Sequence, residues 1–142
     1  MAKVAKLVLI DPKGHLLMLE RSNHPRFGND PDLPGGTLED GESLRETMVR
    51  EVFEEIGAVV DGDAAKHLYG GTDYSAHGVH YVLYALEVPK RPNVTLSWEH
   101  AGYEWLPKDE FVAKAAAAND TFMRMVHDYV KQLDVNQSNT GE

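Results

Sequence analysis

Residues 36–58 read GTLEDGESLRETMVREVFEEIGA, and this stretch predicts one amphipathic helix together with both of its ends. Ser43 and Glu46, three residues apart, form the pattern of an N-terminal capping box. Gly57 stands where the glycine that ends a helix belongs. Apolar side chains recur between them at helical spacing, at Leu44, Met48, Val49, Val52, Phe53 and Ile56. We therefore expect a helix beginning at Ser43, with the apolar stripe packed on a core and the acidic face pointing away from it.

The same helix carries three carboxylates whose spacing indicates a cation site. Glu51, Glu54 and Glu55 stand at i, i+3 and i+4, which stacks them on one face of the helix. Like charges placed in this way repel, and each pair weakens a helix by about a few tenths of a kcal/mol. A hard divalent ion with oxygen ligands, Mg²⁺ or Mn²⁺, would remove the repulsion. A solvated acidic face is the alternative interpretation.

This spacing resembles the Nudix box, the signature of the Nudix (MutT-like) hydrolases. The signature is Gly, five residues, Glu, seven residues, Arg-Glu, a large aliphatic residue, any residue, Glu-Glu, any residue, Gly and a large aliphatic residue. The matching positions are Gly36, Glu42, Arg50, Glu51, Val52, Glu54, Glu55 and Gly57. At roughly 7% usage for each fixed residue type, chance gives about 10⁻⁸ per starting position. Two positions depart from the pattern, because Ala58 is small and Pro31 stands where members often carry Trp.

The resemblance implies roles for the residues of the box. Glu51, Glu54 and Glu55 are implied metal ligands, and the Gly36 carbonyl would add a backbone oxygen. Arg50 would orient a glutamate by ion pairing. A carboxylate cluster that binds fewer ions than it has charges should contain one member of raised pKa, which could act as general base. Glu54 and Arg50 are therefore candidate catalytic residues as well.

Further candidates lie outside the box. Many relatives place the general base or another metal ligand late in the chain, and residues 98–106 resemble a Glu-His…Trp-Leu segment common in the family. Glu99 is the candidate there and Glu104 the second choice, although a surface position fits Glu99 as well. The aromatic residues that could stack on a base are Phe27, Tyr74, Tyr103 and Trp105. Trp98 and Trp105 also suit a core position. Glu39 and Glu42 rank lower, as residues that stabilise the loop.

Composition limits the class of protein. The chain has 142 residues, enough for one domain with a core, and it has no cysteine for disulfides, thiolate metal sites or nucleophiles. Its net charge is −9 and it shows no basic cluster, so double-stranded nucleic acid is not an expected partner. Residues 1–11 contain an apolar run too short for a signal peptide or a membrane span. We expect a cytoplasmic monomer or homodimer that does not bind membranes.

The order of the expected elements predicts the fold class. Strands are expected at residues 4–10, 16–19, 67–73, 79–88, 94–98 and 103–106, and helices at 43–57, 108–118 and 120–133. This order suits a mixed sheet covered by helices on both faces. It agrees with the α/β/α sandwich that the resemblance implies, an α/β (α+β) fold. Residues 1–133 would form a single domain, and the polar residues 134–142 a disordered tail.

The function implied by the resemblance is Mg²⁺-dependent hydrolysis of a phosphoanhydride in a nucleoside diphosphate linked to a second group. The expected substrate is a small molecule of nucleotide type, namely a (deoxy)nucleoside triphosphate, a dinucleoside polyphosphate or a pterin triphosphate. The alternative is a catalytically idle domain of the same fold that binds and senses nucleotides. A third interpretation is a plain soluble domain with an acidic helix.

Overall fold

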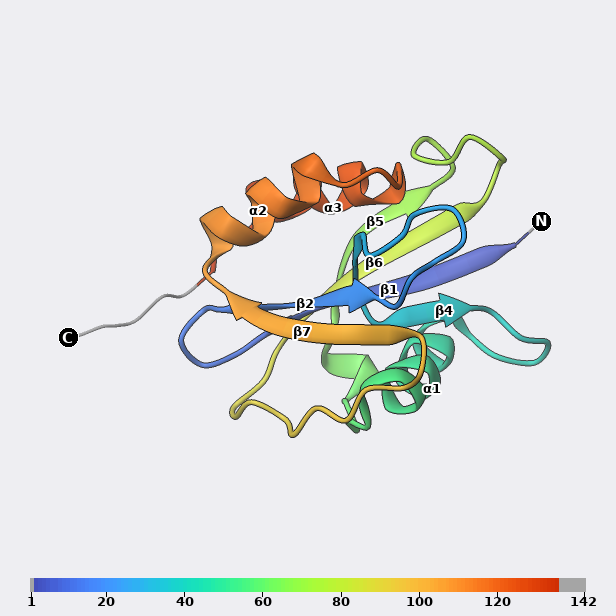
Figure 1. Cartoon of the computed structure of the whole chain (residues 1–142). Coiled ribbons are helices and arrows are strands. Elements are labelled where there is room, and N and C mark those ends of the chain that lie inside the picture. The colour runs from blue at the N-terminus through green and yellow to red at the C-terminus, as the bar shows by residue number, and fades with distance from the viewer. Residues whose placement is uncertain (1, 136–142) are drawn as a thin grey trace.

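The structure is a computed structural model that describes residues 2–135, so residues 136–142 of the expected tail lie outside the described part. The elements follow one another along the chain as shown in Figure 1. They are β1 (Lys3–Ile10), β2 (Leu16–Arg21), β3 (Pro31–Asp32), β4 (Gly35–Thr37), α1 (Leu44–Ile56), the 3₁₀ turn Gly62–Ala64, β5 (Lys66–Gly71), β6 (His80–Glu87), β7 (His100–Leu106), α2 (Lys108–Ala117) and α3 (Phe122–Lys131). No helix among residues 2–135 is long and apolar enough to cross a membrane.

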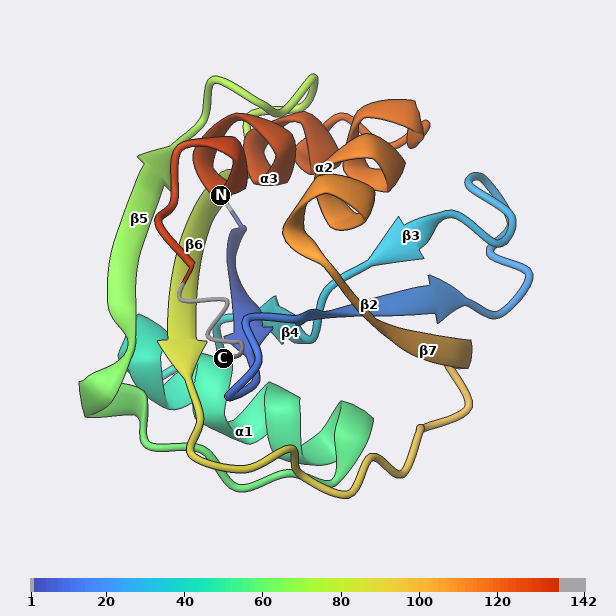
Figure 2. The same ribbon diagram turned by 90° about the vertical axis from the view of Figure 1, so that its left-hand side faces the viewer.

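The strands form one mixed sheet in the order β3-β2-β1-β6-β5, with β4 paired to β1 and β7 paired to β2. Strand β1 runs parallel to β6 along its whole length, whereas the other pairs are antiparallel. Strand β1 meets β2 only at Ile10 and Leu16 and pairs with β4 near its start. Figure 2 shows β2 and β7 turning away from the direction of β5 and β6. The mixed sheet expected from the sequence is confirmed.

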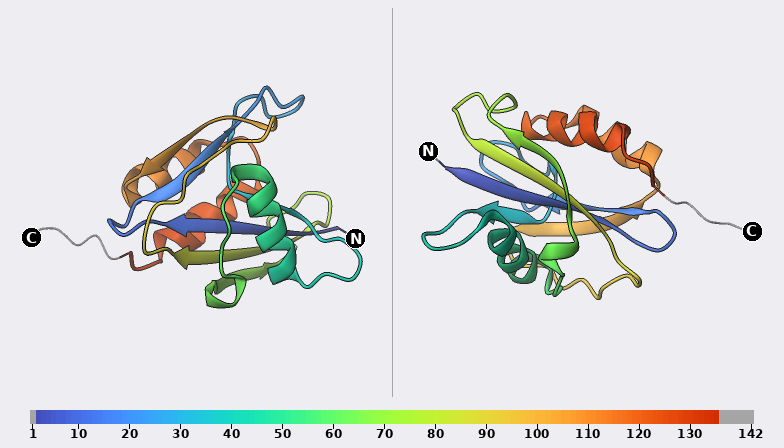
Figure 3. Two further views of the ribbon diagram at one scale, coloured as in Figure 1. Left: turned by 90° about the horizontal axis from the view of Figure 1, so that it is seen from below. Right: turned by 180° about the vertical axis from the view of Figure 1, so that it is seen from behind.

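Helices cover the sheet on both faces, which confirms the expected sandwich. Helix α1 lies on one face, and α2 with α3 lies on the other (Figures 1 and 3). Strand β1 supplies both cores, because side chains alternate along a strand. Its Val8 and Ile10 pack in the core under α2 and α3, and its Leu7 and Leu9 pack in the core under α1. The acidic helix is therefore anchored directly on the central strand.

The two ends of α1 lie where they were predicted, but the burial of two of its residues differs from the prediction. The Ser43–Glu46 capping box is present, and Gly57 ends the helix with a left-handed φ of 74°. The expected core residue Phe53 is instead 55% exposed, and Glu55, expected on the outward face, is only 7% exposed. Met48, Val52 and Ile56 define the buried face, and at 100° per residue position 55 lies beside that face while position 53 lies well away from it.

Residues 94–98 form no strand, contrary to the prediction. Their backbone runs along the end of α1, where Thr95 N–H donates to Ile56 O (2.8 Å) and Ser97 N–H donates to Glu55 O (3.0 Å). The last carbonyls of a helix have no partner inside it, so this segment satisfies them instead of joining the sheet. Trp98, for which a core position was expected, follows at the surface and is 88% exposed.

Candidate active site

A cleft of about 920 Å³ is lined by residues of β1, β2, β3, β4, β6, β7, α1, α3 and the connecting segments. Five residues predicted for the site line it together, namely Phe27, Gly36, Glu51, Glu55 and Glu99. These residues are up to 72 positions apart in the chain (27 to 99), so the fold creates their proximity. Glu54 does not line the cleft, and its side chain is about half exposed on the same helix.

Two glycines let strand β4 pass close to β1 and to α1 at the cleft. The Gly35 N–H donates to Glu55 Oε1 at 3.1 Å. A side chain at Gly35 would overlap the Ala5 carbonyl, and its φ of 146° also disfavours any other residue. A side chain at Gly36 would overlap the Glu51 carboxylate. Gly35 thus allows β4 to lie close to β1, and Gly36 leaves room for the Glu51 carboxylate beside β4.

Arg50 binds several glutamates at once. Its Nε donates to Glu42 Oε2 at 2.6 Å, and its Nη1 donates to Glu51 Oε2 at 2.9 Å and to Glu54 Oε1 at 3.3 Å. The hydrogen bond to Arg50 lowers the pKa of Glu42 to about 2, and the same bond raises the pKa of Arg50. Glu46, which has favourable i, i+4 spacing to Arg50, instead accepts the Ser43 N–H at 2.8 Å. Arg50 therefore fixes the orientation of Glu51 and ties the loop before α1 to the helix.

Two of the glutamates that line the cleft, Glu51 and Glu55, resist ionisation. Burial raises the pKa of Glu55 to about 8, with further upward contributions from Asp32 and Glu99 and a downward one from Lys6. Burial also raises the pKa of Glu51, against the lowering effect of its bond to Arg50. Each carboxylate thus lacks enough positive charge in its surroundings. A bound cation would supply that charge.

The chemistry of the donor set fits Mg²⁺ or Mn²⁺. Carboxylates and a backbone carbonyl are hard oxygen ligands of the kind these ions prefer. Within residues 2–135, no three His, Cys, Asp or Glu side chains are already gathered as a metal site. Glu51 is engaged with Arg50 through Oε2, and Glu55 with Gly35 through Oε1. A carboxylate has two acceptor oxygens, so each of these two glutamates retains a second oxygen that could bind an ion.

A buried polar network forms another part of the cleft. Asp32 accepts from Lys6 Nζ at 2.9 Å, contacts His100 Nε2 at 2.9 Å and lies 3.6 Å from Arg21 Nη2. Burial alone would raise the pKa of Asp32, but Lys6, His100 and Arg21 hold it well below its usual range. Burial lowers the pKa of Lys6, but Asp32 and Glu55 outweigh it and raise that pKa. Sequence reasoning missed this network, although a lysine inside the apolar run of residues 4–10 was a signal for it.

Four other predicted residues lie away from the cleft. Tyr74 donates to Asp128 Oδ2 at 2.7 Å, and its ring packs edge-on against Tyr69. Tyr103 is exposed on β7, and Trp105 of the same strand lies beneath the Arg91 guanidinium. Glu104, the second choice for the general base, pairs with Lys114 at 2.7 Å. Tyr103, Glu104 and Trp105 lie on β7, which pairs with β2, whereas Tyr74 lies in the turn between β5 and β6. Trp98, by contrast, does line the cleft.

An α/β/α sandwich in which a Gly-Gly strand and an acidic helix meet in one cleft defines a Nudix-type protein. The chain belongs to this family, because the NUDIX domain matches it over residues 2–126. An ADP-ribose pyrophosphatase of Methanocaldococcus jannaschii is 32% identical over 81 residues, which make up 56% of this chain and 47% of that protein. The chain thus matches about half the length of that relative.

Solved structures share the fold at lower identity. A MutT protein of Methanosarcina mazei superposes with a TM-score of 0.66 and 22% identity, over 93% of this chain and 96% of that one. The dihydroneopterin triphosphate pyrophosphohydrolase of E. coli superposes with a TM-score of 0.67 and 21% identity, over 92% and 93%. At this identity the likeness is one of fold.

Proposed function

We propose that the protein hydrolyses a phosphoanhydride bond in a nucleoside diphosphate linked to a second group, with Mg²⁺ or Mn²⁺ as cofactor. The observation that carries this proposal is the convergence of Glu51, Glu55, Gly36 and Glu99 on one cleft. Membership of the Nudix family and the name of the M. jannaschii relative support it. Three carboxylates without a cation would repel a polyphosphate. A bound cation would balance the negative charge of both the site and the substrate.

The residues that would hold the ion are Glu51, Glu54, Glu55 and the Gly36 carbonyl. When bound, the ion supplies charge for the phosphate oxygens and makes a water molecule more acidic. Glu54 stands at the exposed edge of this set, next to Arg50. The chain itself contributes the fixed orientation of Glu51, which depends on the Arg50 contact.

Glu99 is the proposed general base. Its carboxylate lines the same cleft and acts electrostatically on both Glu51 and Glu55, whose pKa values it raises. A base in this position could accept the proton of the attacking water in the cleft. Its backbone carbonyl accepts the Ser22 N–H at 2.9 Å, which fixes the place of residue 99 beside β2.

The part of the cleft near Phe27 and Arg21 would receive the group that is not phosphate. The Arg21 guanidinium lies 5.2 Å from the centre of the Phe27 ring, and both residues line the cleft. A flat ring and a planar cation can stack with a heteroaromatic base. The candidate substrates are therefore a (deoxy)nucleoside triphosphate, a dinucleoside polyphosphate, a pterin triphosphate and, from the relative's name, ADP-ribose.

A substrate panel with Mg²⁺ tests the proposal. Each compound is incubated with the protein while inorganic phosphate and pyrophosphate are measured separately, which shows both the substrate and the bond that is cut. Glu55→Gln should lower turnover by at least about hundredfold, since it removes a proposed ligand. Glu110→Gln, on the exposed surface of α2, is the matched control and should behave as wild type.

The outcome separates the competing functions. Turnover that needs Mg²⁺ and falls in Glu55→Gln supports the hydrolase. Nucleotide binding in calorimetry without turnover of any compound would favour the idle sensing domain. If the protein shows no binding and no turnover, the interpretation that remains is a plain domain with an acidic helix. A monomer or homodimer stays our prediction for the quaternary state, which light scattering can measure.

A further inference from the structure

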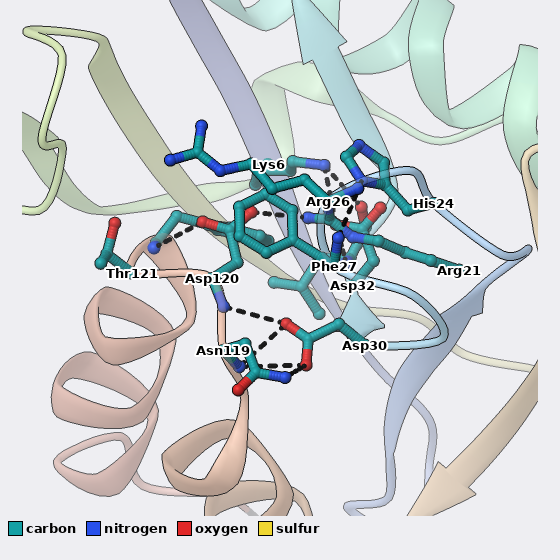
Figure 4. Close-up of polar contacts among 12 residues, drawn as sticks. Lys6, Arg21, His24, Arg26, Phe27, Asp30, Asp32, Asn119, Asp120 and Thr121 are labelled. Atoms are coloured by element: carbon teal, nitrogen blue, oxygen red, sulfur yellow. Dashed lines mark hydrogen bonds and ion pairs between the residues drawn. The ribbon is translucent and has the colours of Figure 1, made fainter.

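Asp30 joins two segments that are distant in the chain. It follows the loop after β2, and its carboxylate is buried, with the residue only 7% exposed. Its oxygens accept the backbone N–H of Asn119 at 3.0 and 3.1 Å and the backbone N–H of Asp120 at 3.0 Å. The Asn119 side chain adds a longer bond of 3.4 Å. Figure 4 shows this carboxylate pointing at the turn between α2 and α3.

The turn that Asp30 holds carries part of the cleft. Asp120 Oδ2 accepts from Arg21 Nη2 at 2.9 Å, and Asp120 Oδ1 accepts the N–H of Phe122 at 3.3 Å. The Arg21 guanidinium lies over both the Phe27 ring (5.2 Å) and the Phe122 ring (5.6 Å). Asp120, Arg21, Phe27 and Phe122 all line the cleft, whereas Asp30 does not.

The contacts form a chain of dependence. Asp30 fixes the backbone at Asn119 and Asp120, this backbone fixes the Asp120 side chain, and Asp120 fixes the Arg21 guanidinium. A buried carboxylate needs hydrogen-bond donors, and bonds to a charged acceptor are stronger than neutral ones. None of these contacts involves Glu51, Glu55 or Glu99. This series of contacts therefore reaches Arg21 and the aromatic rings of the cleft without involving the three glutamates.

We propose that Asp30 is a positioning residue that sets the affinity of the cleft for the non-phosphate group of the substrate, acting through Asp120 and Arg21. This inference rests on the proposed function of the cleft. It assigns to Asp30 an effect on binding and none on the hydrolytic step. The competing interpretation is that Asp30 only stabilises the fold.

Asp30→Asn tests the first link without requiring activity. The change keeps the shape, removes the charge and turns an amide donor toward backbone donors. Amide hydrogen exchange at residues 119 and 120 should become at least about tenfold faster, because charge-assisted bonds protect those groups. The Nε–H resonance of Arg21 should shift as it does in Asp120→Asn. Asn119→Ala is the control, since it removes only the 3.4 Å side-chain bond and keeps both backbone donors.

Kinetics test the second link on whichever compound the substrate panel identifies. Asp30→Asn should raise KM about tenfold, which is the size of effect expected from the loss of one charge-assisted hydrogen bond. It should change kcat by less than about threefold. Inhibition by inorganic pyrophosphate with Mg²⁺ should be unchanged. The double variant Asp30→Asn, Asp120→Asn should raise KM no more than Asp120→Asn alone, because both substitutions break the same chain.

Three results would overturn the inference. These are unchanged exchange at residues 119 and 120, a fall in kcat with KM unchanged, and additive effects in the double variant. A wild-type protein without turnover would refute the proposed function alone. In that case the exchange rates and the Arg21 resonance still decide whether Asp30 positions Asp120.

Discussion

Asp32→Asn removes the negative charge at the centre of the buried network in the cleft. The substitution preserves size, so no cavity forms, but the Lys6 ammonium loses its 2.9 Å partner and the bond from His100 is weakened. Both side chains of the Lys6–Asp32 pair are about nine-tenths buried. Loss of one member of such a pair leaves an uncompensated buried charge and costs roughly 3–5 kcal/mol. We expect the free energy of unfolding at pH 7 to fall by about that amount.

The dependence on pH follows from the two pKa shifts. The pKa of Asp32 is depressed in the folded protein from its ordinary 3.8, so its stabilisation is complete above that value and is lost as the pH falls toward the folded pKa. The pKa of Lys6 is raised from its ordinary 10.5, so its stabilisation is complete below that value and is lost as the pH rises through the folded pKa. The contribution of the Lys6–Asp32 pair to the difference in unfolding free energy between wild type and Asp32→Asn should therefore narrow as the pH falls below 3.8 and as it rises above 10.5.

Urea unfolding followed by circular dichroism at pH 3, 5, 7 and 9 measures this gap. Asp40→Asn, an exposed carboxylate in the loop before α1, is the matched control and should change stability by less than about 0.5 kcal/mol. A gap under about 1 kcal/mol at pH 7 would contradict the energetic role given to the network. A gap that grows as the pH falls below 5 would contradict the sign of the Asp32 shift.

Three further perturbations act on the acidic side of the cleft. Gly36→Ala would push a methyl group into the Glu51 carboxylate and should lower kcat/KM by about 10²-fold, while Gly102→Ala, which meets only the flexible end of Glu20, should retain activity. Arg50→Gln releases Glu51 from its 2.9 Å contact and should weaken Mg²⁺ binding by about 10–100-fold in calorimetry. Mg²⁺ at a hundred times its Kd should raise the free energy of unfolding by about 2.7 kcal/mol. Glu51→Gln should remove most of that gain. An equal gain in the variant would exclude Glu51 as a ligand.

Local patterns in the sequence predicted the parts of the fold that depend on local physics. The capping box at Ser43 and the glycine end of α1 satisfy helix ends by contacts within a few residues, so their positions could be read from spacing. The place of Gly36 beside Glu51 followed from the family resemblance. Residues 94–98 were predicted wrongly because their partners are the carbonyls of α1, which no pattern within the segment reveals.

The polar half of the cleft depends on contacts between distant residues. Asp32 lies 26 positions from Lys6 and 68 from His100, so only the folded sheet brings them together. The aromatic candidates show the same limit, because Phe27 reaches the cleft while Tyr74 joins a different cluster. Residue type showed that each ring could stack, but the position of its loop in the folded chain decides whether it meets the cleft.

Two backbone hydrogen bonds fix the spacing between the helix and the proposed base. Ser97 N–H donates to Glu55 O, and Ser22 N–H donates to Glu99 O. The end of α1 is thereby bonded to residue 97, and the residue that follows β2 is bonded to residue 99. Insertions between β6 and residue 94 should consequently be tolerated, whereas adding or deleting one residue between 95 and 99 would rotate the Glu99 side chain out of the cleft. Variation in loop length during evolution is therefore expected upstream of residues 95–99 and not within them.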